Sequence, residues 1–77
     1  MLKINSVVPI SNHELAVSFE NGETKKCDIS GYLDKGIFRQ LADPSLFRQV
    51  KSIGFGVEWP NSADLSSDTL FAIGQRN

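Results

Sequence analysis

Residues 56–70 read GVEWPNSADLSSDTL and contain the only tryptophan of the chain, followed directly by a proline. In a strand, Val57 and Trp59 would point to the same face because successive side chains alternate. Pro60 has no N–H to donate and holds Trp59 in an extended conformation, so we expect the strand to end at Trp59. Asn61 and Ser62 then suit a turn, because their side chains can bond nearby backbone groups.

The same stretch carries a helix start signal. With Ser66 as the N-cap, Leu65 and Leu70 occupy the N′ and N4 positions, which form a hydrophobic staple. Asp68 then lies in the first turn, where a negative charge interacts favourably with the helix dipole. We expect the indole ring of Trp59 and this staple to join a sheet to a C-terminal helix.

Composition limits the class of protein. A chain of 77 residues suits one compact domain, which we place over residues 1–77. One cysteine excludes an internal disulfide, and one cysteine with one histidine cannot complete a structural zinc site. A net charge of −1 argues against a dedicated nucleic-acid binder, which normally has a basic excess. The lack of an apolar run of about 20 residues and of a secretion signal predicts a cytoplasmic protein without a membrane span.

The first predicted hairpin spans residues 13–29. Apolar and polar residues alternate up to Phe19, and Asn21-Gly22 follows, which is a strong hairpin signal. A two-residue loop would place Glu20 opposite Glu23 and mix apolar with charged side chains on one face. We prefer a three-residue loop with Gly22 in the left-handed conformation, because its inner pairs match better. Those pairs are Phe19 with Glu23, Val17 with Lys25, Leu15 with Cys27 and His13 with Ile29.

Two further segments are predicted to form strands. Between Leu2 and Ile10, the apolar residues at positions 2, 4, 8 and 10 share one parity and would share one face, with Pro9 ending the strand. A second hairpin over residues 50–59 would turn at Gly54-Phe55-Gly56. Together with the first hairpin, these segments predict one small antiparallel sheet of about five short strands.

Three short helices are predicted to pack on this sheet, each with a start or stop signal. Asp34 and Asp43 suit the caps of the first two, and Pro44 suits the first position of the second. The first has an apolar stripe formed by Ile37, Phe38 and Leu41. The third runs from the Ser66 cap to near Gly74. The predicted fold class is therefore α+β.

Two motifs carry a resemblance over most of the chain, from about Ile4 to Leu70. They are F-x-N-G-E at residues 19–23 and W-P-N-x-x-D-L-x-x-D-x-L at residues 59–70. On these motifs the chain resembles a small bacterial family of domains of unknown function, whose pattern usually has Gly in place of Ser62. The resemblance implies a compact α+β fold with no established activity, found alone or as the N-terminal domain ahead of a helix-turn-helix domain. It also implies stand-alone members encoded beside small proteins of toxin–antitoxin character.

No arrangement of reactive groups in the sequence predicts a catalytic centre. Cys27 and His13 would lie on neighbouring strands, but nothing orients or activates the thiol, so we interpret Cys27 as a core residue. Asp28, Glu58 and Asp64 are interpreted as capping or solvated carboxylates. A basic strip of Lys25, Lys26, Arg48 and Lys51 is interrupted by acidic residues and is typical of solvated surface. We therefore predict a non-enzyme without cofactor or metal.

The sequence favours a role in protein interaction. At a hairpin tip, the large apolar side chain of Phe55 is expected to be covered by another chain or by the C-terminal helix. The candidate partner-binding residues are Phe55, Trp59, Pro60, Asn61 and Asp64. The residues expected to be structural are Trp59, Leu65, Leu70, Phe19 and Gly22. We hypothesise a regulatory, antitoxin-like module paired with a co-encoded small protein, or a homodimer. The alternative is a nucleic-acid-associated accessory module of a transcription regulator, in which direct nucleic-acid contact is not expected.

Overall fold

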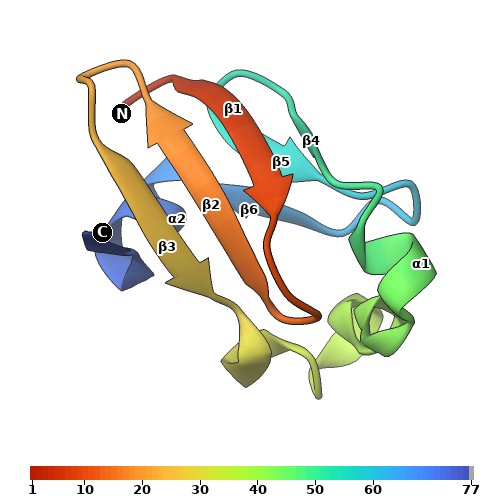
Figure 1. The fold of residues 1–77 in the computed structure, drawn as a ribbon. Helices are drawn as coiled ribbons and strands as arrows, with labels where there is room; N and C mark the ends of the chain where they lie inside the picture. Colours follow the sequence, from red (N-terminus) through yellow and green to blue (C-terminus); the bar gives the residue numbers. More distant parts are fainter. Residues whose placement is uncertain (77) are drawn as a thin grey trace.

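The computed structural model describes residues 1–76; Asn77, which the predicted single domain includes, lies outside the described residues. These residues form two antiparallel sheets, one of four strands in the order β1-β2-β3-β7 and one of three in the order β4-β5-β6 (Figure 1). The α+β class is confirmed. The predicted single sheet of about five strands is wrong, because the strands of the described part divide between two sheets.

The strands and helices are short. The first sheet contains β1 (Ile4–Pro9), β2 (Glu14–Phe19), β3 (Thr24–Asp28) and β7 (Gln75–Arg76). The second contains β4 (Lys51–Ser52), β5 (Gly56–Glu58) and β6 (Asp64–Ser66). The helices are two 3₁₀ helices, η1 (Ser30–Tyr32) and η2 (Gly36–Ala42), and two α-helices, α1 (Pro44–Phe47) and α2 (Ser67–Ile73). Among residues 1–76, none of the helices has the length and apolar character needed to cross a membrane.

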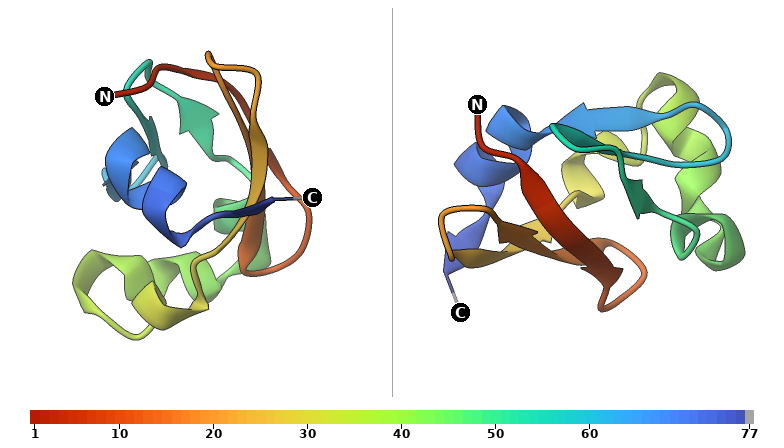
Figure 2. Two further views of the ribbon diagram at one scale, coloured as in Figure 1. Left: turned by 90° about the vertical axis from the view of Figure 1, so that its left-hand side faces the viewer. Right: turned by 90° about the horizontal axis from the view of Figure 1, so that it is seen from above.

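The hydrophobic core lies between the two sheets. Figure 1 looks onto the four-stranded sheet with the three-stranded sheet behind it, and Figure 2 shows the helical segment 30–47 at one end and α2 at one side. The sheets meet where the Ile4 N–H donates to the Gly54 carbonyl over 2.7 Å. The buried residues that the two sheets contribute include Leu15, Val17, Phe19, Cys27, Val57 and Leu65.

The first hairpin has the register predicted for the three-residue loop. Gly22 has a φ of 89°, in the left-handed region that glycine adopts without steric cost. The paired residues are Leu15 with Cys27, Val17 with Lys25, Phe19 with Glu23 and His13 with Ile29. The side chains of Leu15, Val17 and Phe19 therefore all enter the core.

The N-terminal strand departs from the prediction because it contains an irregularity of the β-bulge kind. The pairing register between β1 and β2 shifts between Ile4 and Ser6, and a shift of one residue moves the following side chains to the opposite face. Ile4 is buried, but Val8 is 53% exposed and Ile10 49% exposed. Val7 packs against the core instead. The single apolar face predicted for this strand is therefore wrong beyond Ser6.

The second hairpin is confirmed, although its strands are shorter than predicted. β4 and β5 pair Lys51 with Glu58. The third strand of this sheet, β6, was not predicted, and it places Asp64 opposite Glu58. Only Leu65 of its three residues is buried, so its alternation is too short to recognise in the sequence. Asp64 therefore lies exposed in a strand.

The first predicted helix is a 3₁₀ helix with a different start. Its N-cap is Lys35, without a side-chain hydrogen bond, so the predicted cap at Asp34 is wrong. Of the predicted apolar stripe, Leu41 is buried and Phe38 is half-buried, whereas Ile37 is 43% exposed. The tighter 3₁₀ winding accounts for this, because it places residues at i and i+3 over one another rather than those of an α-helical stripe.

The caps of α1 and α2 are confirmed. The Asp43 carboxylate accepts a hydrogen bond from the Ser45 N–H at 3.0 Å, and Pro44 is the first helical residue. The Ser66 hydroxyl accepts from the Thr69 N–H at 3.2 Å. The two leucines of the predicted staple, Leu65 and Leu70, are both buried in the core.

The indole ring of Trp59 joins β5 to the helical segment 30–47. Its Nε1–H donates to the Phe47 carbonyl over 2.9 Å, and the residue is 1% exposed. The ring centroid lies 6.0 Å from that of Phe47 and 6.4 Å from that of Phe38. Trp59 is therefore a core residue, and the elements that it connects differ from those expected.

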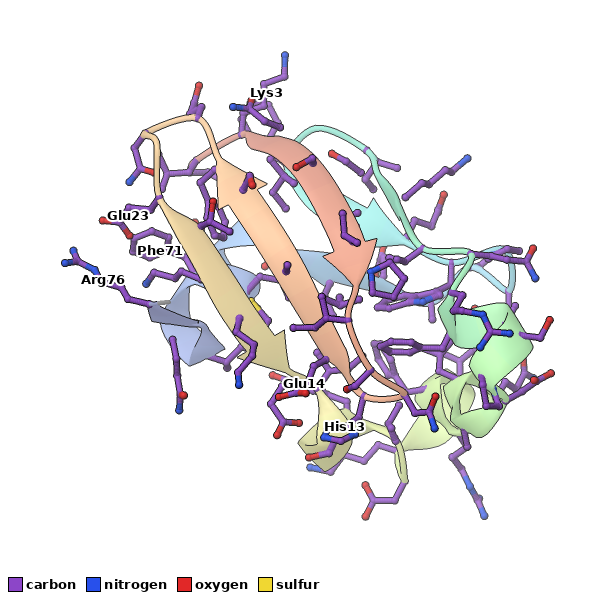
Figure 3. The ribbon with its side chains drawn as sticks, viewed as in Figure 1. Lys3, His13, Glu14, Glu23, Phe71 and Arg76 are labelled. Atoms are coloured by element: carbon purple, nitrogen blue, oxygen red, sulfur yellow. The ribbon has the colours of Figure 1, made fainter. Side chains whose placement is uncertain are left out.

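Other residues hold α2 on the first sheet. The Cys27 thiol donates to the Leu70 carbonyl at 3.3 Å, and the Phe19 and Phe71 rings meet edge to face with centroids 5.2 Å apart. Beyond the helix, an Arg76 guanidinium nitrogen lies 3.1 Å from the Glu23 carboxylate. Figure 3 shows Phe71, Glu23 and Arg76 at the same edge of the sheet. The predicted link from Trp59 to the C-terminal helix is therefore replaced by these contacts.

Replacement of Trp59 by Phe tests the importance of the indole. We expect Trp59→Phe to lower the free energy of unfolding by about 2–4 kcal/mol, because the buried Phe47 carbonyl loses its donor and a cavity remains. Urea denaturation followed by circular dichroism measures the change, since the variant lacks the only tryptophan. Phe55→Leu, at an exposed position, is the control and should cost less than about 0.5 kcal/mol. Equal losses in the two variants would contradict the prediction.

Candidate functional site

An apolar surface lies at the tip of the β4–β5 hairpin. Phe55 is 54% exposed and Ile53 is 50% exposed. We call these two residues the tip surface. The Phe55 carbonyl accepts from the Ser67 N–H at 2.8 Å, which fixes the backbone of the tip to the start of α2 while the ring stays exposed. Ile53 is not among the predicted partner-binding residues. Its position directly before the predicted turn at residues 54–56 would have indicated that it is exposed together with Phe55.

Two glycines make this tip narrow. Gly54 has a φ of 95°, which suits a tight turn that other residues would strain. A side chain at Gly56 would meet the Leu65 carbonyl oxygen at 2.6 Å, so the backbones of β5 and β6 approach closely there. The Phe55 ring thus projects from a backbone that is fixed by the tight turn at Gly54 and by the close approach of β6 at Gly56.

The backbone of the N-terminal segment runs beside the β4–β5 hairpin (Figures 1 and 2). In addition to the bond between Ile4 and Gly54, the Ser52 hydroxyl donates to the Ile4 carbonyl at 3.1 Å. The Lys3 backbone N–H donates to the Glu20 carboxylate at 2.9 Å, and its side chain points away from the sheet (Figure 3). An exposed cation therefore lies at the same end of the molecule as the tip surface.

The W-P-N turn holds two of the predicted partner-binding residues in internal contacts. Trp59 is buried, as described above, so its ring is not part of the surface. The Asn61 amide nitrogen donates to the Ile37 carbonyl (3.3 Å) and to the Gln40 side chain (2.9 Å), and the Asn61 side-chain oxygen accepts from the Ala63 N–H (3.1 Å). Asn61 therefore ties the turn to η2.

Ser62 completes this turn with a φ of 75°, a left-handed conformation that costs a non-glycine residue about 1 kcal/mol or more. We expect Ser62→Gly to raise the free energy of unfolding by about 1 kcal/mol, because that steric cost disappears. Urea denaturation followed by tryptophan fluorescence measures it. Ser45→Gly, inside α1, is the matched control and should lower stability by about 0.5–1 kcal/mol. Destabilisation by both changes would disprove strain at Ser62.

The predicted partner-binding residues do not form one surface. Pro60 and Asp64 are exposed, but Pro60 lies just beyond Glu58, the last residue of β5, and Asp64 pairs with Glu58. Phe55 precedes the first residue of β5, and a strand of three residues spans roughly 10 Å. A shallow hollow of about 250 Å³ near Pro60 is lined by Gln49, Lys51, Glu58, Trp59, Pro60 and Ser62. Its rim is largely polar, so the apolar tip surface and this hollow are separate features.

The Cys27 thiol faces the core. It is fully buried and donates to the Leu70 carbonyl rather than to an imidazole. Burial raises the pKa of the Cys27 thiol to about 11, although the nearby Lys25 ammonium partly opposes this. Because the thiolate is the reactive form, this environment favours the packing role predicted for Cys27.

The raised pKa of Cys27 makes stability depend on pH. In the unfolded chain the thiol ionises near its ordinary value of 9.0, whereas in the fold it stays protonated to about 11. Its contribution to stability is therefore complete below pH 9 and is lost as the pH rises toward 11. We expect the stability difference between wild type and Cys27→Ala, measured by urea denaturation, to shrink over this range. A difference that stays constant from neutral pH upward would contradict the burial effect.

The lysines of the first hairpin have partners within the chain. The Lys25 ammonium donates to the Phe71 carbonyl at 2.9 Å and lies 3.5 Å from the centroid of the Phe71 ring. The Lys26 ammonium lies 3.6 Å from the Glu14 carboxylate. Phosphate contacts need available cations, so these interactions weaken the case for the nucleic-acid alternative.

Comparison with known families gives a match over residues 4–76 to a family model described as protein of unknown function, DUF2442. The searches of curated proteins and of solved structures found no match. The matched range covers both sheets and all four helices of the described residues.

Proposed function

The chain belongs to the DUF2442 family of proteins of unknown function, and we propose that it acts as a non-catalytic, protein-binding module. The observation that carries this proposal is the exposure of Phe55, with Ile53 beside it, on a backbone fixed to α2. Binding energy at protein interfaces concentrates in a few large, well-packed side chains, among which aromatic ones are prominent. The phenyl ring of Phe55 would serve as such an anchor.

The rigid backbone of the tip makes this anchor effective. Binding orders side chains and loops, and that ordering costs free energy. At the tip the Phe55 carbonyl is already bonded to the Ser67 N–H, and the adjacent Gly54 carbonyl to the Ile4 N–H. Little further ordering is required when a partner encloses the ring.

The partner that we propose is a co-encoded small protein with an apolar pocket large enough for a phenyl ring. Such a pairing would be regulatory and antitoxin-like, and it would take place in the bacterial cytoplasm. The buried, protonated thiol of Cys27 and the internal contacts of Trp59 and Asn61 support a role in which side chains serve packing and recognition rather than chemistry.

The test compares two exposed apolar residues. We expect Phe55→Ser to weaken binding to the purified product of the neighbouring gene by roughly 30-fold or more, because an interface anchor contributes at least about 2 kcal/mol. Isothermal titration calorimetry measures the affinity. Ile37→Ser, at a residue 43% exposed on η2, is the control and should leave affinity unchanged.

Two outcomes would overturn the proposal. Equal affinities of wild type and Phe55→Ser would exclude the tip surface from the interface. If sedimentation shows wild-type dimers that Phe55→Ser abolishes, and the neighbouring product does not bind, then the occupant of the tip surface is a second copy of this chain.

A further inference from the structure

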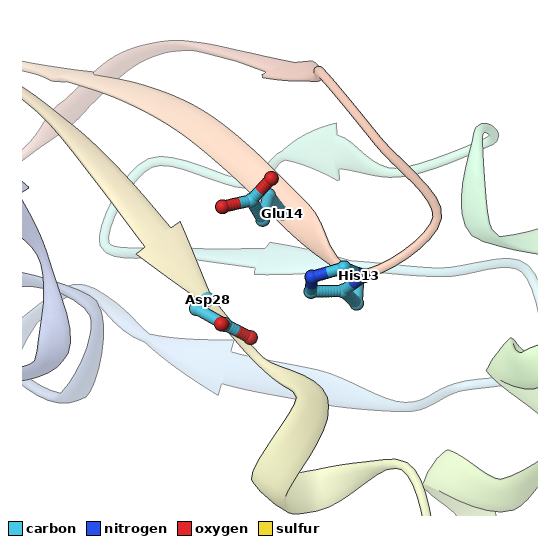
Figure 4. Close-up of side chains that lie close together, drawn as sticks. All are labelled: His13, Glu14 and Asp28. Carbon is cyan, nitrogen blue, oxygen red and sulfur yellow. The ribbon is translucent and has the colours of Figure 1, made fainter.

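Three potential metal ligands meet where the first hairpin opens. His13, Glu14 and Asp28 each offer a ligand atom, and these atoms all lie within 4.8 Å of one another. Figure 4 shows the imidazole ring beside the two carboxylates, which extend from β2 and β3. Because the chain has one histidine, this is the sole place where an imidazole can join carboxylates.

The backbone holds the three residues in place. Glu14 and Asp28 are direct partners across β2 and β3, and the Ile29 N–H donates to the His13 carbonyl at 2.9 Å. The ligands therefore come from paired strands near one end of the hairpin. This end is distant from the tip surface, since the six residues of β2 span roughly 20 Å.

Each carboxylate is oriented by a hydrogen bond to one of its oxygens. Glu14 Oε1 accepts from the Ser11 hydroxyl at 3.0 Å, and Asp28 Oδ1 accepts from the Ser30 N–H at 2.9 Å. Groups that hydrogen-bond to metal ligands commonly fix the orientation of those ligands. The Ser11 hydroxyl and the Ser30 N–H would do this for Glu14 and Asp28. The Ser30 bond also lowers the pKa of Asp28, so this carboxylate is charged at neutral pH.

We propose that His13, Glu14 and Asp28 bind a divalent transition-metal ion, with Zn²⁺ the best match, and that solvent completes the coordination. Imidazole nitrogen and carboxylate oxygen are both common Zn²⁺ ligands, and sites with three protein ligands keep one open position. Ligand atoms around tetrahedral Zn²⁺ lie roughly 3.3 Å apart. The ligand atoms lie within 4.8 Å of one another on half-exposed or exposed side chains, so bringing them to that spacing requires rotation of these side chains but no movement of the core.

One residue opposes this ion. The Lys26 ammonium lies 3.6 Å from Glu14 Oε2, where its positive charge repels a bound cation. Lys26 therefore lowers the affinity of the site for a cation, and its removal should increase that affinity. A bound ion would also link β2 to β3 and stabilise the open end of the hairpin.

The experiment is a Zn²⁺ titration of the untagged protein in a buffer that does not bind metals. Calorimetry should show one site, and the ring resonances of the single histidine should shift in the NMR spectrum. His13→Gln and Asp28→Asn should each weaken binding by about tenfold or more, whereas Lys26→Gln should strengthen it a few-fold. Zn²⁺ should also raise the melting temperature of the wild type.

Asp64→Asn is the matched control. Asp64 and Glu58 are also carboxylates paired across two strands, but no imidazole accompanies them, so this change should not alter the affinity. Circular dichroism verifies that each variant is folded. The proposal is overturned if the folded wild type shows no binding at millimolar Zn²⁺, or if His13→Gln binds Zn²⁺ as tightly as wild type.

Discussion

The Trp59 Nε1–H donates to the Phe47 carbonyl over 2.9 Å inside the core, and the middle third of the chain takes its position from that bond. The segment from residue 30 to residue 47 consists of short helices, which have little stability of their own. Packing of Phe38 and Phe47 against the indole, together with the bonds from Asn61 to η2, fixes these helices on β5. Pro60 stops the strand at the right place for this arrangement.

Local rules predicted the parts of the fold that depend on a few neighbouring residues. The hairpin register followed from Asn21-Gly22, and the caps at Asp43 and Ser66 followed from their side chains. The bulge after Ile4, the third strand at residues 64–66 and the division into two sheets depend on contacts between distant segments. No periodicity within one segment encodes such contacts, which explains why those predictions failed.

The candidate sites were predictable to different extents. Phe55 was identified because a large apolar residue between two glycines is unusual at a tip, and the structure leaves it 54% exposed. Trp59 and Asn61 were grouped with it by sequence proximity, although Trp59 is buried and the Asn61 side chain bonds to η2. The cluster of His13, Glu14 and Asp28 was overlooked, even though the predicted register already placed Glu14 opposite Asp28. His13 precedes β2, so the pairing of β2 with β3 does not show that its imidazole lies beside the two carboxylates.

The contact between Ile4 and Gly54 has a practical consequence for experiments on this protein. Because it brings Ile4 alongside the hairpin that carries Phe55, a purification tag or fusion domain placed before Met1 would be attached within a few residues of that hairpin and would obstruct a partner sterically. Attachment after β7 avoids this obstruction, since Arg76 lies at the opposite edge of the four-stranded sheet from β1. Binding assays therefore need a C-terminal or cleavable label.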